Sequence, residues 1–264
     1  MKPLIQVTGL TMGWGTTLLL EGASFAVQSG AVFAILGGSG CGKSTLLRLL
    51  VGLEPPLAGT IEIDGVTDIE LQVGRPRYGV MFQGGALFGS MTVGENLALP
   101  LKQWTDLPRE AIGAIVEAKL RLVGLHDAEG KLPSELSGGM KKRAAIARAM
   151  VLEPPLIFLD EPSAGLDPVS SAELDQLIGT LNRALGMTVV IVTHELESLF
   201  TIATDCIMLD KASRSIIARG TPSQLRDQAT DPRVSDFLNR RLTAPEQAPA
   251  PEPELERAGT EVRT

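Results

Sequence analysis

Residues 37–45 read Gly-Gly-Ser-Gly-Cys-Gly-Lys-Ser-Thr and bring a lysine and hydroxyls together with glycines. Glycine, four residues and then Gly-Lys-Ser is the P-loop pattern. Glycines let backbone N–H groups curve around phosphate oxygens, and a helix beginning at the lysine adds unpaired N–H groups and its positive dipole end. Lys43 is expected on the β- and γ-phosphates and Ser44 on Mg²⁺. The expected phosphate-binding residues are Gly37, Gly38, Ser39, Gly40, Cys41, Gly42, Lys43, Ser44 and Thr45.

Two acids follow the apolar run at residues 156–159 and form a second candidate group. Such a run is typical of a buried strand, so Asp160 and Glu161 are expected at the carboxyl edge of a sheet, where α/β proteins bind ligands. Asp160 suits Mg²⁺ ligation, and Glu161 suits polarising an attacking water as general base. The alternative is a strand end with ordinary surface acids, but a P-loop upstream favours the hydrolytic interpretation.

His194 follows another apolar run, residues 188–193. It is expected to hydrogen-bond the γ-phosphate or to orient Glu161 and its water. A lone histidine at a strand end is more often structural, so this role depends on the P-loop and the acids. Cys41 has two interpretations: a thiol made oxidisable by the helix dipole, or a small side chain that is simply tolerated, which we favour.

The P-loop needs a strand before it and a helix after it. Residues 31–36 are apolar and predict the strand, and shorter strands separated by Gly-rich turns are predicted at 5–10 and 23–27. The leucines expected on one side of the following helix, which begins at Lys43, are Leu46, Leu47, Leu50 and Leu53.

From residue 156 onward, predicted strands and helices alternate, as in a parallel sheet covered on both faces. This predicts a three-layer α/β fold. Between about residues 84 and 150 the pattern changes to helices, which suggests an inserted helical lobe. Within it, apolar residues recur at helical spacing and are interpreted as a core face: Ile112, Ile115, Val116, Leu120 and Val123.

The chain has 264 residues, 44% of them hydrophobic, which suffices for one large domain with its own core. A formal charge of -7 argues against nucleic acid as a partner, because phosphates are bound through a basic face. Its 2 cysteines have no metal or disulfide spacing and fit a reducing compartment. No signal peptide or membrane-spanning run is recognisable, so any membrane role is expected to be peripheral.

The segment Leu136-Ser137-Gly138-Gly139-Met140, followed by KKRAAIARAM, resembles the signature motif of ABC ATPases. The family's other landmarks occur in the same order, including Gln83 and the Asp loop at residues 163–167. The resemblance covers about residues 4–240. It implies an α/β P-loop NTPase of the ABC type, with a three-layer core, an antiparallel β edge subdomain and a helical subdomain inserted at about 84–150. Residues 1–240 are then one ATPase domain, and 241–264 are a Pro/Glu-rich tail expected to be disordered when isolated.

The resemblance implies an ATPase that uses ATP and Mg²⁺ and works as a homodimer. In the family, the signature of one subunit closes over the γ-phosphate on the other subunit's P-loop, so Ser137, Gly138 and Gly139 are expected to bind nucleotide across a two-fold interface. Gln83 is expected at the Mg²⁺ ion and the reacting water. Trp14 lies where the family places an aromatic residue that stacks on adenine, with simple packing as the alternative.

Three segments are similar to the ATPases of Mce-type phospholipid transporters, the Mla-like systems of Gram-negative envelopes: ELSGGMKKRAAIARAMVLEPPLIFLDEP, FQGGALFGSMTVGENLALPL and DPRVSDFL. Met140 replaces the commoner signature glutamine and cannot make its amide hydrogen bonds. The resemblance implies a location on the cytoplasmic face of the inner membrane, an integral-membrane permease, and a periplasmic Mce lipid-binding protein reached through it.

In that family, permease helices dock between the core and the helical lobe. Leu87, Phe88 and Met91 are candidates for this groove, with burial in the lobe as the alternative. A grip of the tail on the partner ATPase is a further, weaker hypothesis. The alternatives to phospholipid transport are another ABC importer or exporter with a different cargo, a soluble mechanical ABC ATPase, and a P-loop kinase, which would leave the signature without a purpose.

Overall fold

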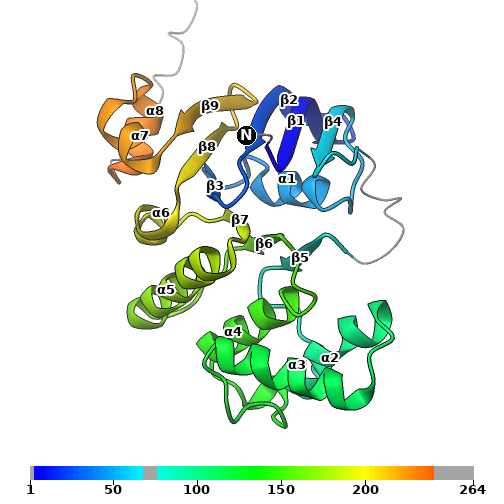
Figure 1. The fold of residues 1–264 in the computed structure, drawn as a ribbon. Helices are drawn as coiled ribbons and strands as arrows, with labels where there is room; N and C mark the ends of the chain where they lie inside the picture. Colours follow the sequence, from blue (N-terminus) through cyan, green and yellow to red (C-terminus); the bar gives the residue numbers. More distant parts are fainter. Residues whose placement is uncertain (1–2, 68–75, 241–264) are drawn as a thin grey trace, which may run out of the picture.

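A computed structural model describes residues 3–67 and 76–240, which form two β-sheets and a set of surrounding helices (Figure 1). The tail at 241–264, for which disorder and a grip on a partner are predicted, lies outside the described residues. Among the described helices, none combines the length and the apolar character that crossing a membrane requires.

The larger sheet has the strand order β5-β6-β7-β3-β8-β9, in which only β9 runs antiparallel to its neighbour. Every residue of β3, β6 and β7 is buried, which explains why their sequences are apolar without alternation. The predicted parallel sheet is therefore confirmed. Its strands are β3 (Val32–Gly37), β5 (Tyr78–Met81), β6 (Leu156–Asp160), β7 (Thr188–Val192), β8 (Asp205–Asp210) and β9 (Ser215–Gly220).

The smaller sheet is antiparallel, in the order β2-β1-β4. The strands predicted at 5–10 and 23–27 are both present but longer than expected: β1 (Ile5–Trp14) continues past Leu10 and β2 (Thr17–Val27) begins before Gly22. Gly9 lies inside β1, as predicted, whereas Gly22 lies inside β2 and not in the expected turn. Both glycines have positive φ, +60° and +61°, and the pairing register shifts along β1, so they lie in β-bulges rather than turns. The third strand, β4, is Ala58–Ile63.

Helix α1 (Lys43–Leu50) begins where predicted, but Leu53 was wrongly placed on it. The helix ends before Gly52, whose φ is +65°, and Leu53 is 60% exposed. The other helices of the α/β part are α5 (Pro168–Leu185), α6 (Leu196–Ile202), α7 (Pro222–Gln228) and α8 (Pro232–Leu238).

The core lies on both faces of the larger sheet, which confirms the three-layer α/β fold. On one face, α1 is packed between the two sheets, and on the other the sheet packs on α4, α5, α6 and α8. Because β3 runs through the middle of the sheet, the loop that follows it is held by packing on both sides.

A separate group of helices, green in Figure 1, lies beyond β5 and β6. It contains α2 (Val93–Trp104), α3 (Arg109–Leu122), a short 3₁₀ turn (Pro133–Glu135) and α4 (Gly138–Ala149), and it has its own hydrophobic core. The predicted apolar face of α3 packs on that core, where Ile115 is partly buried and the other four predicted residues, including Val123 just after the helix, are buried. Helix α4 also packs on the sheet through Ala145 and Ile146, so it belongs to both cores. The extent of the lobe, about 84–150, stays a prediction.

Candidate active site

The loop after β3 has a backbone that requires glycine at two positions. Gly37 has φ +144°, and a Cβ atom there would lie 2.5 Å from both Cys41 Sγ and the Leu209 carbonyl oxygen. Gly42, directly before α1, has φ +102° and leaves 2.9 Å between an added Cβ and Met12 Cε. The loop therefore curves tightly and exposes its N–H groups at the start of α1, as phosphate binding requires.

Lys43 lies folded over this loop. Its Nζ donates hydrogen bonds to the carbonyl oxygens of Gly37, at 2.8 Å, and Gly38, at 3.1 Å. The loop lines a cavity of about 600 Å³ that also brings together residues far apart in the sequence. The cavity is lined by Leu19, Gly37, Gly38, Ser39, Gly40, Gly42, Lys43, Ser44, Thr45, Gln83, Glu161, His194 and Phe237.

The two acids at the end of β6 lie at the carboxyl edge of the sheet beside this cavity. Asp160 is 7% exposed and Glu161 is 9% exposed. Glu161 has φ +48°, a left-handed conformation that costs a non-glycine residue about 1 to 3 kcal/mol and is typical of functional sites. Its Oε1 lies 2.8 Å from His194 Nδ1, so the predicted pairing of acid and histidine is present in the geometry.

Two oxygens of these acids, Asp160 Oδ1 and Glu161 Oε2, are buried without a hydrogen-bond partner among the described residues. Burial, together with the negative charge of Glu161, raises the pKa of Asp160 despite the attraction of Arg48 and Lys142. Lys142 itself lies 3.1 Å from the Glu161 carbonyl oxygen, to which its Nζ donates, and burial lowers its pKa. Nearby cations offset the burial of the acids only in part, and the two oxygens without a partner among the described residues are available to a bound cation or water.

The acids fit Mg²⁺, which prefers oxygen ligands and keeps several waters and phosphate oxygens. Ser44 at the start of α1 and Gln83 line the same cavity as Glu161, and Asp160 precedes Glu161 with a free buried oxygen. Among the described residues no group of three His, Cys, Asp or Glu side chains could hold a metal by itself. The oxygen ligands of Ser44, Gln83 and Asp160 suit a hard cation whose other ligands come from phosphate.

Cys41 does not line the cavity; it is buried beneath the loop, 2% exposed. Burial raises the pKa of its thiol, although the charge of Lys43 acts in the opposite direction. The interpretation of Cys41 as an oxidisable thiol was therefore wrong, and the small-residue interpretation explains it. The buried position of Cys41 beneath Gly37 leaves little space for a larger side chain.

Trp14 ends β1 and is half-exposed. Its Nε1 donates to Thr45 Oγ1 at 3.4 Å, which fixes the indole beside the end of the phosphate loop without burying it. This position leaves a ring face for a ligand, but the stacking role stays a prediction. Leu19, across the β1–β2 hairpin, lines the cavity and was not singled out from the sequence; its apolar neighbours gave no signal of a site.

The residues of the predicted signature motif, Ser137, Gly138 and Gly139, lie outside the phosphate-loop cavity. Ser137 caps α4, and its Oγ accepts a hydrogen bond from the Met140 N–H at 3.3 Å. Gly138 and Gly139 open the helix against Leu166 and Ser170, so a Cβ at Gly138 would lie 3.3 Å from Leu166. Ser137, Gly139 and Met140 line a cavity of about 270 Å³ that shares no residue with the phosphate-loop cavity. One chain thus carries two separate cavities, and the residue roles assigned to them stay predictions.

Phe237 and Lys142 contribute to the site without having been assigned a role from the sequence. Phe237 lies in the segment DPRVSDFL, which indicated a family likeness but not a position. Lys142 is one of several basic residues after the signature, and only its burial, 7% exposed, sets it apart. The arrangement as a whole can bind a polyphosphate and present a carboxylate base to water.

Comparison with known proteins agrees with this arrangement. The family model described as ABC transporter matches residues 20–164. The intermembrane phospholipid transport system ATP-binding protein MlaF of Haemophilus influenzae is 41% identical over 247 residues, which cover 92% of each chain. The probable ribonucleotide transport ATP-binding protein mkl of Mycobacterium tuberculosis is 43% identical over 247 residues, 91% of this chain and 68% of that protein.

A solved structure is similar in fold. It is the dimeric post-hydrolysis state of the ATP-binding cassette MJ0796 bound to ADP and Pi, with a TM-score of 0.73, 28% identity, and coverage of 82% of this chain and 98% of that one. The similarity extends over most of both chains, in agreement with the ABC type of P-loop fold expected from the sequence.

Proposed function

Because the chain belongs to the ABC transporter family, whose ATP-binding subunits hydrolyse ATP, we propose that it powers phospholipid transport between the inner and outer membranes of a Gram-negative envelope. The ATPase assignment rests on one observation above all. A single cavity contains the phosphate loop, Lys43 and the Glu161–His194 pair, which hydrolysis of a phosphoanhydride requires.

In the proposed reaction, the loop N–H groups and Lys43 hold the phosphates. Glu161 Oε2, which has no partner among the described residues, accepts a proton from water while His194 holds the other carboxylate oxygen. The water oxygen bonds to the γ-phosphorus as the bond to the bridging oxygen breaks, giving ADP and phosphate. Ser44, Gln83 and Asp160 would hold Mg²⁺, which supplies positive charge to the phosphate oxygens.

The working unit is a homodimer in this proposal. Each chain has its signature cavity and its phosphate-loop cavity lined by separate residues, so neither half-site completes the other within one subunit. A two-fold axis would place Ser137 of each subunit over the phosphate loop of the other, using one surface twice. The MJ0796 cassette, described as dimeric with ADP and Pi, is a precedent for this arrangement.

A permease is the expected membrane partner, and the loop between β5 and α2 is the proposed contact. Phe88 in this loop is 52% exposed, with the Arg148 guanidinium 6.0 Å from the ring centroid. Asn96, fully buried, accepts from the Phe88 N–H and donates to the carbonyl oxygens of Phe88 and Met91. A rigid loop that presents an aromatic side chain is suited to docking, whereas Leu87 packs inward against both neighbouring cores.

The identity of the transported molecule is the most specific part of the proposal. The names of the two relatives differ, phospholipid for MlaF and ribonucleotide for mkl. Phospholipid is favoured because the MlaF match covers 92% of both chains and because the three segments quoted above resemble Mce-type ATPases. A periplasmic Mce lipid-binding protein, reached through the permease, and a position on the cytoplasmic face of the inner membrane follow from the same proposal.

Purification of the chain from native membranes tests the proposal directly. The expected result is a complex with a multi-spanning permease and an Mce protein, containing phospholipid that organic extraction and mass spectrometry identify. A soluble receptor loaded with a small solute would instead indicate ordinary import. ATPase activity stimulated by nucleic acid or ribosomes would favour a soluble mechanical ABC protein, and phosphate transfer to a small molecule would favour a kinase.

A further inference from the structure

Helix α8, at the end of the described chain, supplies one wall of the nucleotide cavity. Phe237 lines the cavity beside the residues of the phosphate loop. Its neighbours Val234 and Leu238 are buried in the core under the larger sheet, one helical turn apart, and they anchor the helix. A helix of 7 residues makes few internal hydrogen bonds, so its placement depends on additional fixation at its first turn.

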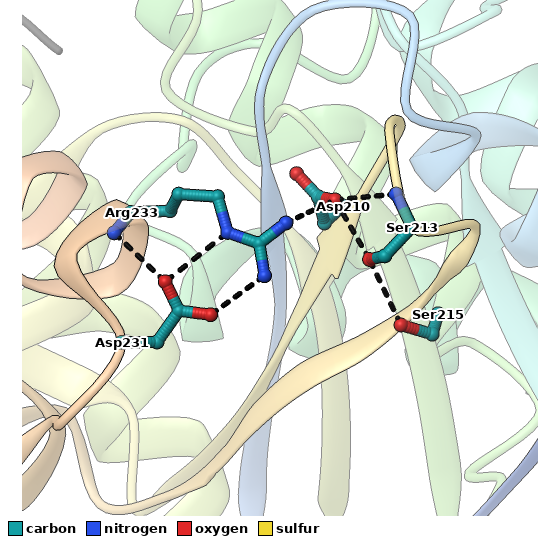
Figure 2. Close-up of polar contacts among 5 residues, drawn as sticks. All are labelled: Asp210, Ser213, Ser215, Asp231 and Arg233. Carbon is teal, nitrogen blue, oxygen red and sulfur yellow. Dashed lines mark hydrogen bonds and ion pairs between the residues drawn. The ribbon is translucent and has the colours of Figure 1, made fainter. Parts of the chain in front are cut away.

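That fixation comes from a polar cluster centred on Arg233 (Figure 2). The guanidinium donates to both carboxylate oxygens of Asp231, at 3.1 and 2.7 Å, and to Asp210 Oδ2 at 2.7 Å. Asp210 Oδ2 also accepts from the N–H and the Oγ of Ser213, each at 2.7 Å, and Ser215 Oγ donates to Ser213 Oγ at 2.9 Å. We call these five residues the α8 clamp; it joins α8 to the β8–β9 hairpin.

The clamp holds α8 next to the strand that carries the phosphate loop. Asp210 directly follows Leu209, which is paired with Gly37 in the register of β8 and β3. Arg233 and Phe237 are four residues apart in α8 and therefore lie on the same side of the helix, one turn apart. The position of the guanidinium therefore sets the position of the phenyl ring relative to the loop.

We propose that Phe237 contacts the bound nucleotide and that Arg233 is its positioning residue, so that the α8 clamp sets the affinity for ATP. The inference rests on the proposed ATP binding and adds a residue to that same site. An apolar ring beside the loop excludes water, and charge attraction between Lys43 and phosphate is stronger where water is excluded. The fork of an arginine is needed because a lysine cannot donate to both oxygens of Asp231 in a fixed plane and to Asp210 as well.

The test measures ATP binding by isothermal titration, and KM and kcat of hydrolysis, with the full chain. Phe237→Ala is expected to raise the Kd and the KM for ATP about fivefold, on the scale of one aromatic contact, and to change kcat less than about twofold. Phe237→Tyr keeps the ring and is expected to bind like the parent. If Phe237→Ala does not fold, Phe237→Leu removes the ring but keeps part of the apolar volume, so it is expected to raise the Kd for ATP less than Phe237→Ala, by about twofold; an unchanged Kd in a folded Phe237→Leu variant would then count against the contact.

Arg233→Ala and Arg233→Lys are both expected to raise the KM about threefold, since neither keeps the fork. Combining Arg233→Ala with Phe237→Ala should give no loss beyond that of Phe237→Ala, because the two residues act through one ring. Arg226→Ala on α7 is the matched control: this arginine also pairs with an acid, Asp227, and lies over a ring, Phe200, but it does not line the nucleotide cavity. The affinity of the Arg226→Ala variant for ATP should equal that of the parent.

The outcomes are distinct. A parent that neither binds nor hydrolyses ATP would overturn the proposed function and this inference with it. A parent that binds ATP, together with a folded Phe237→Ala variant of equal Kd and KM, would overturn the inference and leave the proposed function standing. Additive losses in the double variant would overturn the positioning role of Arg233 alone.

Discussion

Acidic side chains at the carboxyl ends of two parallel strands of the larger sheet have opposite surroundings. At the end of β6, Asp160 and Glu161 are almost fully buried, and each keeps a buried oxygen without a partner among the described residues. At the end of β8, Asp210 is also mostly covered, yet one of its oxygens accepts three hydrogen bonds, from Ser213 and Arg233. The two ends are separated by β7 and β3, which carries the phosphate loop.

The pKa values of these acids follow the same division. Burial raises the pKa of Asp160, and the charge of Glu161 adds to the effect. Burial acts on Asp210 as well, but the hydrogen bonds from Ser213 and the charge of Arg233 outweigh it and hold its pKa below the ordinary value. The same type of residue therefore has two uses: the α8 clamp is complete by itself, whereas the pair on β6 is destabilising until a cation and water reach it.

The largest expected effect concerns Glu161. Glu161→Gln keeps the shape of the side chain but removes the carboxylate proposed as the base. Steady-state hydrolysis should therefore fall about 10²- to 10⁴-fold, and size-exclusion chromatography with ATP should show an accumulated dimer. The control is Glu117→Gln, an exposed residue paired with Arg121 on α3, which should hydrolyse ATP like the parent. Normal turnover in Glu161→Gln would show that another group is the base.

Asp160→Asn should have effects of opposite sign on activity and stability. Loss of the proposed Mg²⁺ ligand should lower hydrolysis on the order of 10²-fold. Without nucleotide and Mg²⁺, however, the free energy of unfolding in urea should rise by about 1 kcal/mol, because the amide carries no buried unpaired charge. A less stable variant would mean that the carboxylate is already compensated within the chain.

Asp210→Asn should change the free energy of unfolding in the opposite direction to Asp160→Asn. It weakens charge-assisted hydrogen bonds to Ser213 and Arg233, so the free energy of unfolding should fall by about 1 to 3 kcal/mol in the same assay. Asp227→Asn is the matched control, since its pair with Arg226 is solvent-exposed and screened by water, so this variant should unfold at nearly the same urea concentration as the parent. Equal losses in the two variants would contradict a special role for the α8 clamp.

The smallest expected effect is the pH dependence of the stability changes caused by Asp160→Asn and Asp210→Asn. Hydrogen bonds from Arg233 lower the pKa of Asp231, as partners lower that of Asp210, so the clamp contributes stability above the ordinary aspartate pKa of about 3.9, and this is lost as pH falls through the folded values. Asp160 has a raised pKa, so its cost to stability disappears as pH falls toward 3.9. The gain in Asp160→Asn should thus shrink at a higher pH than the loss in Asp210→Asn. Unfolding curves between pH 7 and pH 3 measure both.

The sequence was sufficient where chemistry is local or follows directly from a strand end. The P-loop is contiguous, and Glu161 and His194 end adjacent strands, so a parallel sheet alone brings them together. The start of α1 followed from Lys43 for the same reason. Local sequence also indicated the buried strands, because a strand covered on both faces is apolar throughout.

Other features depended on contacts between distant segments. Gly9 and Gly22 are bulges because neighbouring strands continue past them, which no local pattern reveals. Cys41 has a raised pKa because it is buried beneath the loop, although its sequence position alone suggests a lowered one. Phe237 reaches the cavity only through the packing of α8 and the ion pairs of Arg233, and Lys142 reaches Glu161 only through the packing of α4.

Helix α4 has a mechanical consequence. Its first end is capped by Ser137 in the signature cavity, and its Lys142 holds the backbone carbonyl of Glu161. Lys142 follows Ser137 by five residues, a rise of about 7.5 Å along the helix, so a displacement of the capped end is transmitted over one to two helical turns to the end of strand β6. In the proposed two-fold dimer, the start of α4 would touch the nucleotide bound to the neighbouring subunit. Its Lys142 would then couple that contact to the position of Glu161 in its own subunit, so the two proposed hydrolytic sites would influence each other mechanically.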